Sequence, residues 1–230
     1  MKTPLPSREA LIESTVQLAP LTLIDGSWLQ GFTDYERASS ELGRFLFETY
    51  WDELGNGQPR INHPRIYREL LDQMQIDLPP TRSREFAESP LLEDVSFELP
   101  VYWLGVGRFP TTFMPEILGL NVAMELSGVG GSYRRARIAL KHHGFSTRFV
   151  DIHNTIDNVA TGHSAWAADA VDTYIANVGH SQGHEAQAQV WDRVRVGFVS
   201  LSPPSGFLAR RAQRRAQKEA FARASNSRPS

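Results

Sequence analysis

The chain has 230 residues, 41% of them apolar and 22% charged, which is the balance of a globular protein and a length that fits one domain with one core. It has no cysteine, which excludes a disulfide framework, a thiolate zinc site, a cysteine-ligated iron–sulfur cluster and a cysteine nucleophile. The net charge of −2 gives no general attraction to nucleic acid or to a membrane surface.

Charge is distributed unevenly along the chain. Residues 206–230 hold seven basic residues and one acid, so residues 1–205 carry a charge of −8. We therefore expect one domain over residues 1–205 and a basic C-terminal helix or tail over residues 206–230, which we interpret as a solvated terminus and not as a nucleic-acid site. No apolar run is long enough to span a membrane, and no segment is typical of a secretion signal, so we expect a cytoplasmic protein.

Helical periodicity dominates the sequence, and no alternating pattern with a hairpin turn interrupts it. The sequence therefore predicts an all-α bundle of about seven to nine helices. In chain order, we expect helices over residues 7–19, 35–54, 63–75, 100–109, 115–126, 133–143, 146–178 and 186–199. Residues 78–94 contain Pro and Ser and indicate a loop, and Gly162 is a point at which the long segment can be interrupted.

The first candidate metal ligands are Glu53 and His63. Glu53 lies at the end of one predicted helix and His63 at the start of the next, and the turn Gly55-Asn56-Gly57 separates them. A tight turn between antiparallel helices can bring the two side chains together. The alternative is that Glu53 is solvated and that His63 belongs only to a helix cap.

A further candidate, Glu125, lies in a predicted helix whose other residues are mostly apolar. A carboxylate that faces a core is costly unless it is paired, protonated or bound to a metal. Glu116 is nine residues earlier and lies on the opposite face of an ideal helix, so the two carboxylates should not share a site. The alternative is an ion pair between Glu125 and Arg134 or Arg135.

The third set of candidates is His153, Asp157 and His163. His153 and Asp157 are four residues apart and share one helix face, which is a common way to present two ligands to one metal. A salt bridge between them is the alternative. His163 is about 80° away from His153 around an ideal helix, so either the helix is distorted before His163 or this residue is not a direct ligand.

Taken together, these positions supply carboxylates and imidazoles without a thiolate: Glu53, His63, Glu125, His153, Asp157 and His163. Helical bundles with inward-facing Glu and His side chains hold dinuclear iron or manganese, and this donor set favours those metals over structural zinc. The expected pocket walls are apolar and aromatic, with these candidates: Phe47, Trp51, Tyr102, Phe109, Phe113 and Leu126. Arg134 and Arg148 are candidates to bind a substrate carboxylate.

Four segments in order resemble the haem-oxygenase-like diiron oxidase and oxygenase family, which is also described as a family of iron-containing redox enzymes. The segments are residues 23–30, 52–57, 115–121 and 153–163, and the resemblance extends from about residue 20 to about residue 198. It implies a haem-oxygenase-like helical bundle. It also implies that Glu53, His63 and His163 hold one iron, whereas Glu125, His153 and Asp157 hold the other.

The resemblance further implies a function. Such enzymes bind two Fe(II) ions without haem, receive external electrons from a reductase or a chemical reductant, and activate O2 to oxidise a small metabolite. The implied reactions are N-oxygenation, C–C cleavage, desaturation or decarboxylation, and nitrile formation in natural-product biosynthesis. An amino-acid-derived substrate is favoured, manganese is the alternative metal, and no catalytic residue is proposed beyond the metal ligands.

Other functions stay open from the sequence alone. One is a metal-independent haem-oxygenase-like bundle, such as a cofactor-free oxidase or a hydrolase. Another is a non-catalytic helical interaction module in which the polar residues form salt bridges. A homodimer is also left open. The missing cysteine and the full set of ligands disfavour the metal-independent enzyme, and the burial of Glu125 disfavours the interaction module.

Overall fold

The computed structural model describes residues 5–128, 131–156 and 162–201. Within these ranges the regular structure is helical and contains no strand, which confirms the predicted all-α class. The described residues form eleven α-helices, of which nine are longer than four residues. They are α1 (Arg8–Thr22), α2 (Tyr35–Ala38), α3 (Glu41–Glu53), α4 (His63–Gln73), α5 (Arg84–Ala87), α6 (Glu98–Arg108), α7 (Met114–Gly128), α8 (Gly131–His142), α9 (Arg148–Ile156), α10 (His163–Gln182) and α11 (His184–Ser200).

Short 3-10 helices connect several of these elements: η1 (Ser27–Phe32), η2 (Gly55–Gly57), η3 (Pro59–Ile61) and η4 (Asp94–Phe97). None of the described helices is both long and apolar enough to cross a membrane. The predicted tail at residues 206–230 and the predicted domain boundary at residue 205 lie outside the described residues.

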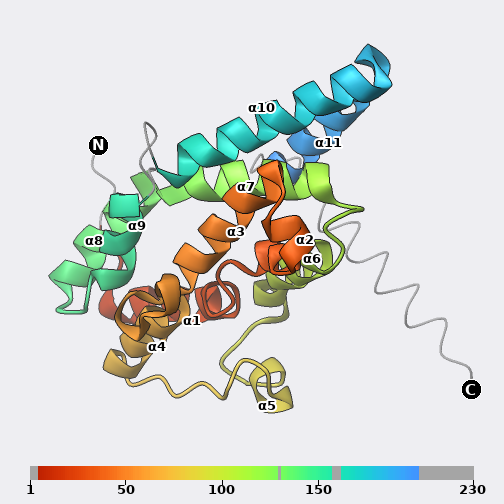
Figure 1. Cartoon of the computed structure of the whole chain (residues 1–230). Coiled ribbons are helices and arrows are strands. Elements are labelled where there is room, and N and C mark those ends of the chain that lie inside the picture. Colours follow the sequence, from red (N-terminus) through yellow and green to blue (C-terminus); the bar gives the residue numbers. More distant parts are fainter. Residues whose placement is uncertain (1–4, 129–130, 157–161, 202–230) are drawn as a thin grey trace, which may run out of the picture.

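Two apolar cores divide the bundle, although the sequence predicts one. The first core joins α1, α4, α8 and α9 through residues such as Leu11, Leu70 and Phe149. The second joins η1, α3, α6, α7, α10 and α11 around Trp28 and Trp103. Figure 1 shows this division, with α10 and α11 paired along α7 on one side and with α1, α4, α8 and α9 gathered at the other end.

Side-chain caps start several of the helices. The Ser7 hydroxyl accepts a hydrogen bond from the Ala10 amide at the start of α1, as the sequence predicts. The predicted helix over residues 35–54 is wrong because Ser40 caps a new helix by accepting from the Gly43 amide. The predicted loop over residues 78–94 contains the single turn α5.

The predicted segment 146–178 is not continuous. It forms α9, which ends at residue 156, and α10, which begins at His163 with Gly162 in an extended conformation before it. The interruption at Gly162 that the sequence allowed is therefore observed, and it gives His163 a direction that does not depend on α9.

The contact between α7 and α11 depends on two glycines. A Cβ atom built on Gly119 would overlap the backbone oxygen of Val194, and one built on Gly197 would overlap the backbone oxygen of Glu116. The two helices therefore cross backbone to backbone, which fixes α7 and the buried Glu125 that it carries.

We expect Gly197→Ala to lower the free energy of unfolding by about 1–3 kcal/mol, because the added methyl has no space. Gly105→Ala is the matched control, since a Cβ at Gly105 on α6 meets nothing within 4 Å. That variant should be more stable by about 0.5–1 kcal/mol from helix propensity. Urea unfolding measures both, and equal effects at the two glycines would contradict the close crossing.

Candidate metal centre

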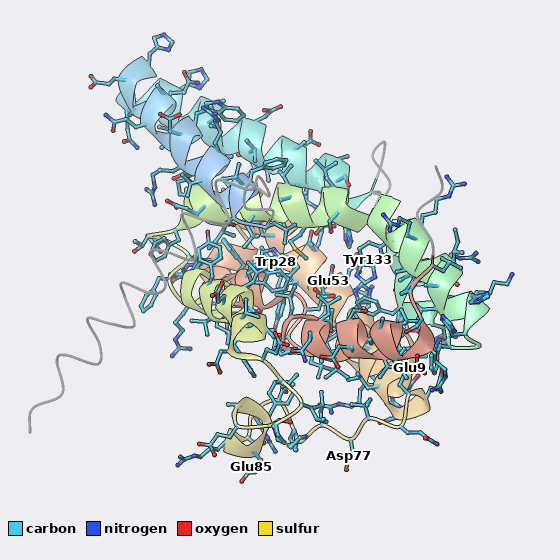
Figure 2. The ribbon with its side chains drawn as sticks, turned by 180° about the vertical axis from the view of Figure 1, so that it is seen from behind. Glu9, Trp28, Glu53, Asp77, Glu85 and Tyr133 are labelled. Atoms are coloured by element: carbon cyan, nitrogen blue, oxygen red, sulfur yellow. The ribbon has the colours of Figure 1, made fainter. Side chains whose placement is uncertain are left out.

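Five of the six predicted ligands are described, and all five are buried: Glu53, His63, Glu125, His153 and His163. Asp157 lies outside the described residues. Figure 2 shows Glu53 among the packed helices, whereas Asp77 and Glu85 lie at the outer edge of the molecule. The five side chains lie between the two apolar cores, since α4 and α9 belong to the first core and α3, α7 and α10 to the second.

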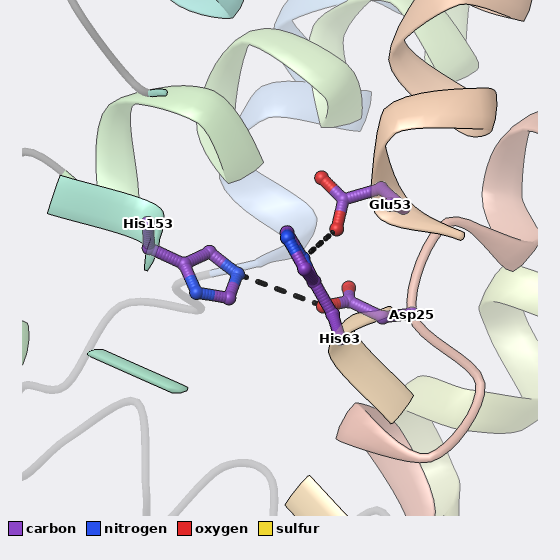
Figure 3. Close-up of side chains that lie close together, drawn as sticks. All are labelled: Asp25, Glu53, His63 and His153. Carbon is purple, nitrogen blue, oxygen red and sulfur yellow. Dashed lines mark ion pairs between the residues drawn. The ribbon is translucent and has the colours of Figure 1, made fainter. Parts of the chain in front are cut away.

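A first group of ligand atoms lies where α3, α4 and α9 meet the turn after α1. Its members are Asp25, Glu53, His63 and His153, and one ligand atom from each lies within 4.8 Å of the others. His63 Nδ1 and His153 Nε2 both lie 3.6 Å from Asp25 Oδ2. His63 Nδ1 also forms an ion pair with Glu53 Oε2, as Figure 3 shows.

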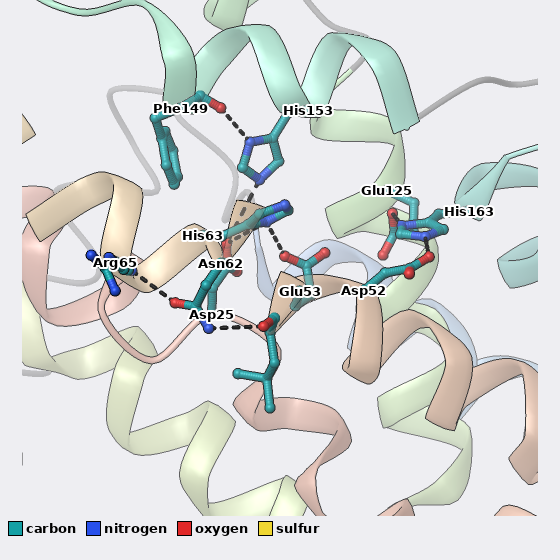
Figure 4. A network of polar contacts seen from close by, with 11 residues as sticks. Asp25, Asp52, Glu53, Asn62, His63, Arg65, Glu125, Phe149, His153 and His163 are labelled. Carbon is teal, nitrogen blue, oxygen red and sulfur yellow. Dashed lines mark hydrogen bonds and ion pairs between the residues drawn. The ribbon is translucent and has the colours of Figure 1, made fainter. Parts of the chain in front are cut away.

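A second group consists of Glu53, Glu125 and His163, whose ligand atoms again lie within 4.8 Å of one another. His163 Nδ1 lies 3.3 Å from Glu125 Oε2. Figure 4 shows this group beside the first one. Glu53 belongs to both groups, so the two groups share one carboxylate.

The turn between α3 and α4 brings Glu53 and His63 together, as the sequence allowed. The Asn62 side chain caps α4 by accepting from the Arg65 amide at 2.9 Å, and it donates to the Leu54 backbone oxygen at 2.9 Å. One amide therefore joins the end of α3 to the start of α4. His63 is the first residue of α4 and Glu53 the last of α3.

Asp25 is the ligand candidate that the sequence prediction missed. It lies in the turn between α1 and η1, and the next residue, Gly26, has a φ of 80°. A Cβ on Gly26 would lie 3.1 Å from Glu53 Cβ, so the absence of a side chain at this position lets the turn lie directly against Glu53. The signal in the sequence was an acid inside the apolar segment 23–29, followed by glycine.

The histidines are grouped differently from what the family resemblance implied. His63 lies with His153, and their ring centroids are 4.4 Å apart. His163 lies with Glu125. The reason is the break before α10, which lets His163 approach α7 and α3, whereas α9 places His153 against α4.

Oxygen acceptors outside the two groups orient two of the imidazoles. His153 Nδ1 lies 2.7 Å from the Phe149 backbone oxygen, and His163 Nε2 lies 2.8 Å from Asp52 Oδ2. Each contact uses one ring nitrogen as the donor and leaves the other nitrogen free to bind a metal. Asp52 in turn accepts a hydrogen bond from the Asn56 side chain.

Four buried polar atoms in the two groups make no hydrogen bond of good geometry: Glu53 Oε2, both ring nitrogens of His63, and His163 Nδ1. Three of them face an oppositely charged group in an ion pair, whereas His63 Nε2 does not. Buried polar atoms are almost always hydrogen-bonded in proteins, so this concentration of atoms without a good hydrogen bond fits a ligand site. A metal ion accepts lone pairs from oxygen and nitrogen and would engage Glu53 Oε2, His163 Nδ1 and one ring nitrogen of His63. Carboxylate with imidazole suits iron or manganese. The residues present therefore fit an iron site.

The charges of the groups are strongly coupled. Burial acts to lower the pKa of His63, but Glu53 and Asp25 outweigh it and raise this pKa to about 10. Burial also acts to lower the pKa of His163, but Asp52 and Glu125 outweigh it and raise this pKa to about 10. Burial and the nearby Asp25 raise the pKa of Glu53. In the metal-free protein, protons on the imidazoles thus compensate the negative charge of the carboxylates. A bound metal cation would take the place of these protons.

Other predicted residues lie elsewhere. Glu116 faces away from Glu125 and binds Arg193 with both carboxylate oxygens at 2.7 Å, as the helix geometry predicted. The alternative partners of Glu125, Arg134 and Arg135, are exposed. Arg148 binds Glu69 at 2.8 Å.

A cavity of about 390 Å³ adjoins the first group, and Asp25 forms part of its wall. None of the six apolar and aromatic wall candidates is among the described residues that line it. Trp51, Phe109 and Leu126 are exposed. The predicted wall residues therefore do not line this cavity, much of whose wall is formed by α1 instead.

A model of the iron-containing redox enzyme family matches residues 13–198. The chain belongs to this family. The haem-oxygenase-like identity and the all-α bundle expected from the sequence are both confirmed, and the family supports a redox function that uses iron. A search of curated proteins found no match, and neither did a search of solved structures.

The metal-free protein should lose stability as the pH rises from 6.5 to 10. His63 and His163 have folded-state pKa values of about 10, above the ordinary value of 6.5, so their contribution is complete below pH 6.5 and is lost on deprotonation. Urea unfolding in the presence of a chelator at pH 6.5 and 9.5 measures this. The decline should be smaller in His63→Gln, and a metal-free protein that is equally stable at both pH values would contradict the prediction.

We expect Asp52→Asn to weaken metal binding at the second group about 10- to 100-fold, because the carboxylate that orients His163 is lost. Anaerobic titration with Fe(II) measures the affinity. Glu48→Gln is the matched control. Glu48 lies on the same helix, and its ion pair is with the exposed Arg44. Wild-type affinity at both sites in Asp52→Asn would rule out the orienting role.

Proposed function

We propose that this iron-containing redox enzyme is a non-haem diiron oxidoreductase that uses O2 to oxidise a small molecule. The observation that carries the proposal is the pair of buried ligand groups that share Glu53. Two groups with a common carboxylate suit two metal ions held close together, and the family already supports iron.

The first iron would be held by the first group: Asp25, Glu53, His63 and His153. The second iron would be held by Glu53, Glu125 and His163. We also propose Asp157 as a ligand, because it follows His153 by four residues, which is one helical turn. Manganese has the same ligand preferences and is the alternative metal.

Iron held by these residues would supply redox chemistry toward O2, with a reductase or a chemical reductant as the external source of electrons. The chain's own residues have other tasks. Burial of Glu53 and Glu125 keeps bulk water away from the ligand groups. Asp52 and the Phe149 carbonyl hold His163 and His153 in one orientation.

The substrate would enter the cavity that Asp25 lines and would lie next to the first group. N-oxygenation, C–C cleavage, desaturation or decarboxylation, and nitrile formation in natural-product biosynthesis are the reactions that we propose for such a centre. The other two functions are less well supported. A metal-independent enzyme or an interaction module gives no reason for a concentration of buried Glu53, His63 and His163 atoms without a good hydrogen bond.

Anaerobic reconstitution with Fe(II) tests the proposal. We expect about two irons per chain, and we expect O2 consumption with a transient visible absorption when the loaded protein is mixed with O2. Glu125→Gln should lower the iron content to about one per chain, because the second group loses a carboxylate. Glu116→Gln is the matched control on the same helix, since Glu116 pairs with Arg193 outside the site, and it should keep both irons.

Two outcomes would sink the proposal. One is iron binding no higher than background in the wild-type protein. The other is a Glu125→Gln variant with the same iron content as Glu116→Gln. The free energy of unfolding of each variant is measured in parallel, so that a loss of iron is not confused with a loss of folding.

A further inference from the structure

We propose that the cavity beside Asp25 binds an uncharged, apolar molecule. Its role as the substrate of the oxidoreductase rests on the proposed function, whereas its binding does not. This class differs from the amino-acid-derived substrate that the sequence favoured. The inference is drawn from the side chains of the cavity wall and from the hydrogen bonds that these side chains already make.

The wall of the cavity is mostly hydrocarbon. It is built from α1, α4, α6, α7, α8 and α9, and representative lining residues are Leu11, Leu18, Leu70, Leu140 and Phe149. Among the lining residues that the structure describes there is no Lys, Arg or His. In the metal-free protein, a ligand carboxylate would therefore meet no cation from the described wall, which is costly.

Four hydroxyl groups in the wall already donate to backbone oxygens. Ser14 and Thr15 both donate to the Leu11 backbone oxygen, at 2.9 and 2.8 Å. Thr22 donates to the Leu18 backbone oxygen at 3.1 Å, and Tyr67 donates to the Thr15 backbone oxygen at 2.8 Å. These protons satisfy helix carbonyls and are not offered to a ligand. The Trp103 indole N–H also lines the cavity and has no hydrogen-bond partner, so the wall offers a donor to an uncharged polar group such as a hydroxyl, but no cation.

The cavity extends from the surface to the metal centre. Ser14 and Leu18 are exposed, and Leu18 retains 46% of its accessible surface. At the other end Asp25 is buried, and it is the only charged residue among the described lining residues. Tyr133 also lines the cavity, and its ring lies 5.0 Å from that of His153. An apolar molecule that enters along α1 would therefore end beside the first ligand group.

Binding to the metal-free, full-length protein tests the proposal independently of iron. A neutral fluorescent probe, N-phenyl-1-naphthylamine, is displaced by straight-chain alcohols from hexanol to decanol. Each added methylene that enters the wall should tighten binding about fourfold. Decanoate and decylamine should bind at least tenfold more weakly than decanol. The described wall offers no cation to a carboxylate, and its one carboxylate, Asp25, already faces His63 and His153. Charged chains within tenfold of decanol, or alcohols without a length dependence, would overturn the proposal.

Substitutions in the cavity wall test whether decanol binds in this cavity. Ala136→Phe fills the cavity from α8, and Ser14→Trp narrows its exposed end. Both should lower the affinity for decanol at least tenfold, whereas Ala168→Phe, an exposed control on α10, should not change it. Ser14 is exposed, so its substitution keeps the test valid if Ala136→Phe fails to fold. Wild-type affinity in Ser14→Trp would also overturn the proposal.

The iron measurement separates this inference from the proposed function. If the wild-type protein holds no iron but binds alcohols with the expected dependence on chain length, the proposed function fails and the apolar binding site stands. If the protein holds two irons and binds charged chains as well as it binds decanol, the proposed function stands and the apolar class fails.

Discussion

The structure depends on how it accommodates a set of carboxylates and imidazoles between two apolar cores. Burying even one unpaired charge costs several kcal/mol, and here the buried groups include Asp25, Glu53 and Glu125. Their protein partners are the imidazoles that face them. Glu53 contributes to both ligand groups, so α3, which ends at this residue, links the two halves of the bundle.

Local chemistry explains what the sequence could predict. Caps and glycines act over a few residues, so the turn at residues 55–57 and the Asn62 cap were sufficient to suggest that Glu53 and His63 meet. The buried position of Glu125 followed from its apolar neighbours. The break at Ser40 was missed because a serine inside a helical pattern can either continue the helix or cap a new one, and only the approach of Gly43 to the Arg37 backbone oxygen decides this.

The grouping of the histidines could not be predicted from such local signals. His63 and His153 are 90 residues apart, and whether they meet depends on how α4 packs against α9. His163 is out of phase with His153 only if the helix continues, and the break at Gly162 removes that constraint. Asp25 was missed for a related reason, because a single acid in a turn has no periodic pattern and its role depends on the contact between Gly26 and Glu53.

Asp25 also makes the two ligand groups unequal. It contacts both imidazoles of the first group and lines the cavity. By contrast, Glu125 and His163 are not among the residues that line the cavity, and His163 is held from the other side by Asp52. A bound molecule would therefore meet the first group and not the second. The second group is therefore the one that a molecule in the cavity does not reach. Changes to the cavity wall should alter the surroundings of His153 more than those of His163.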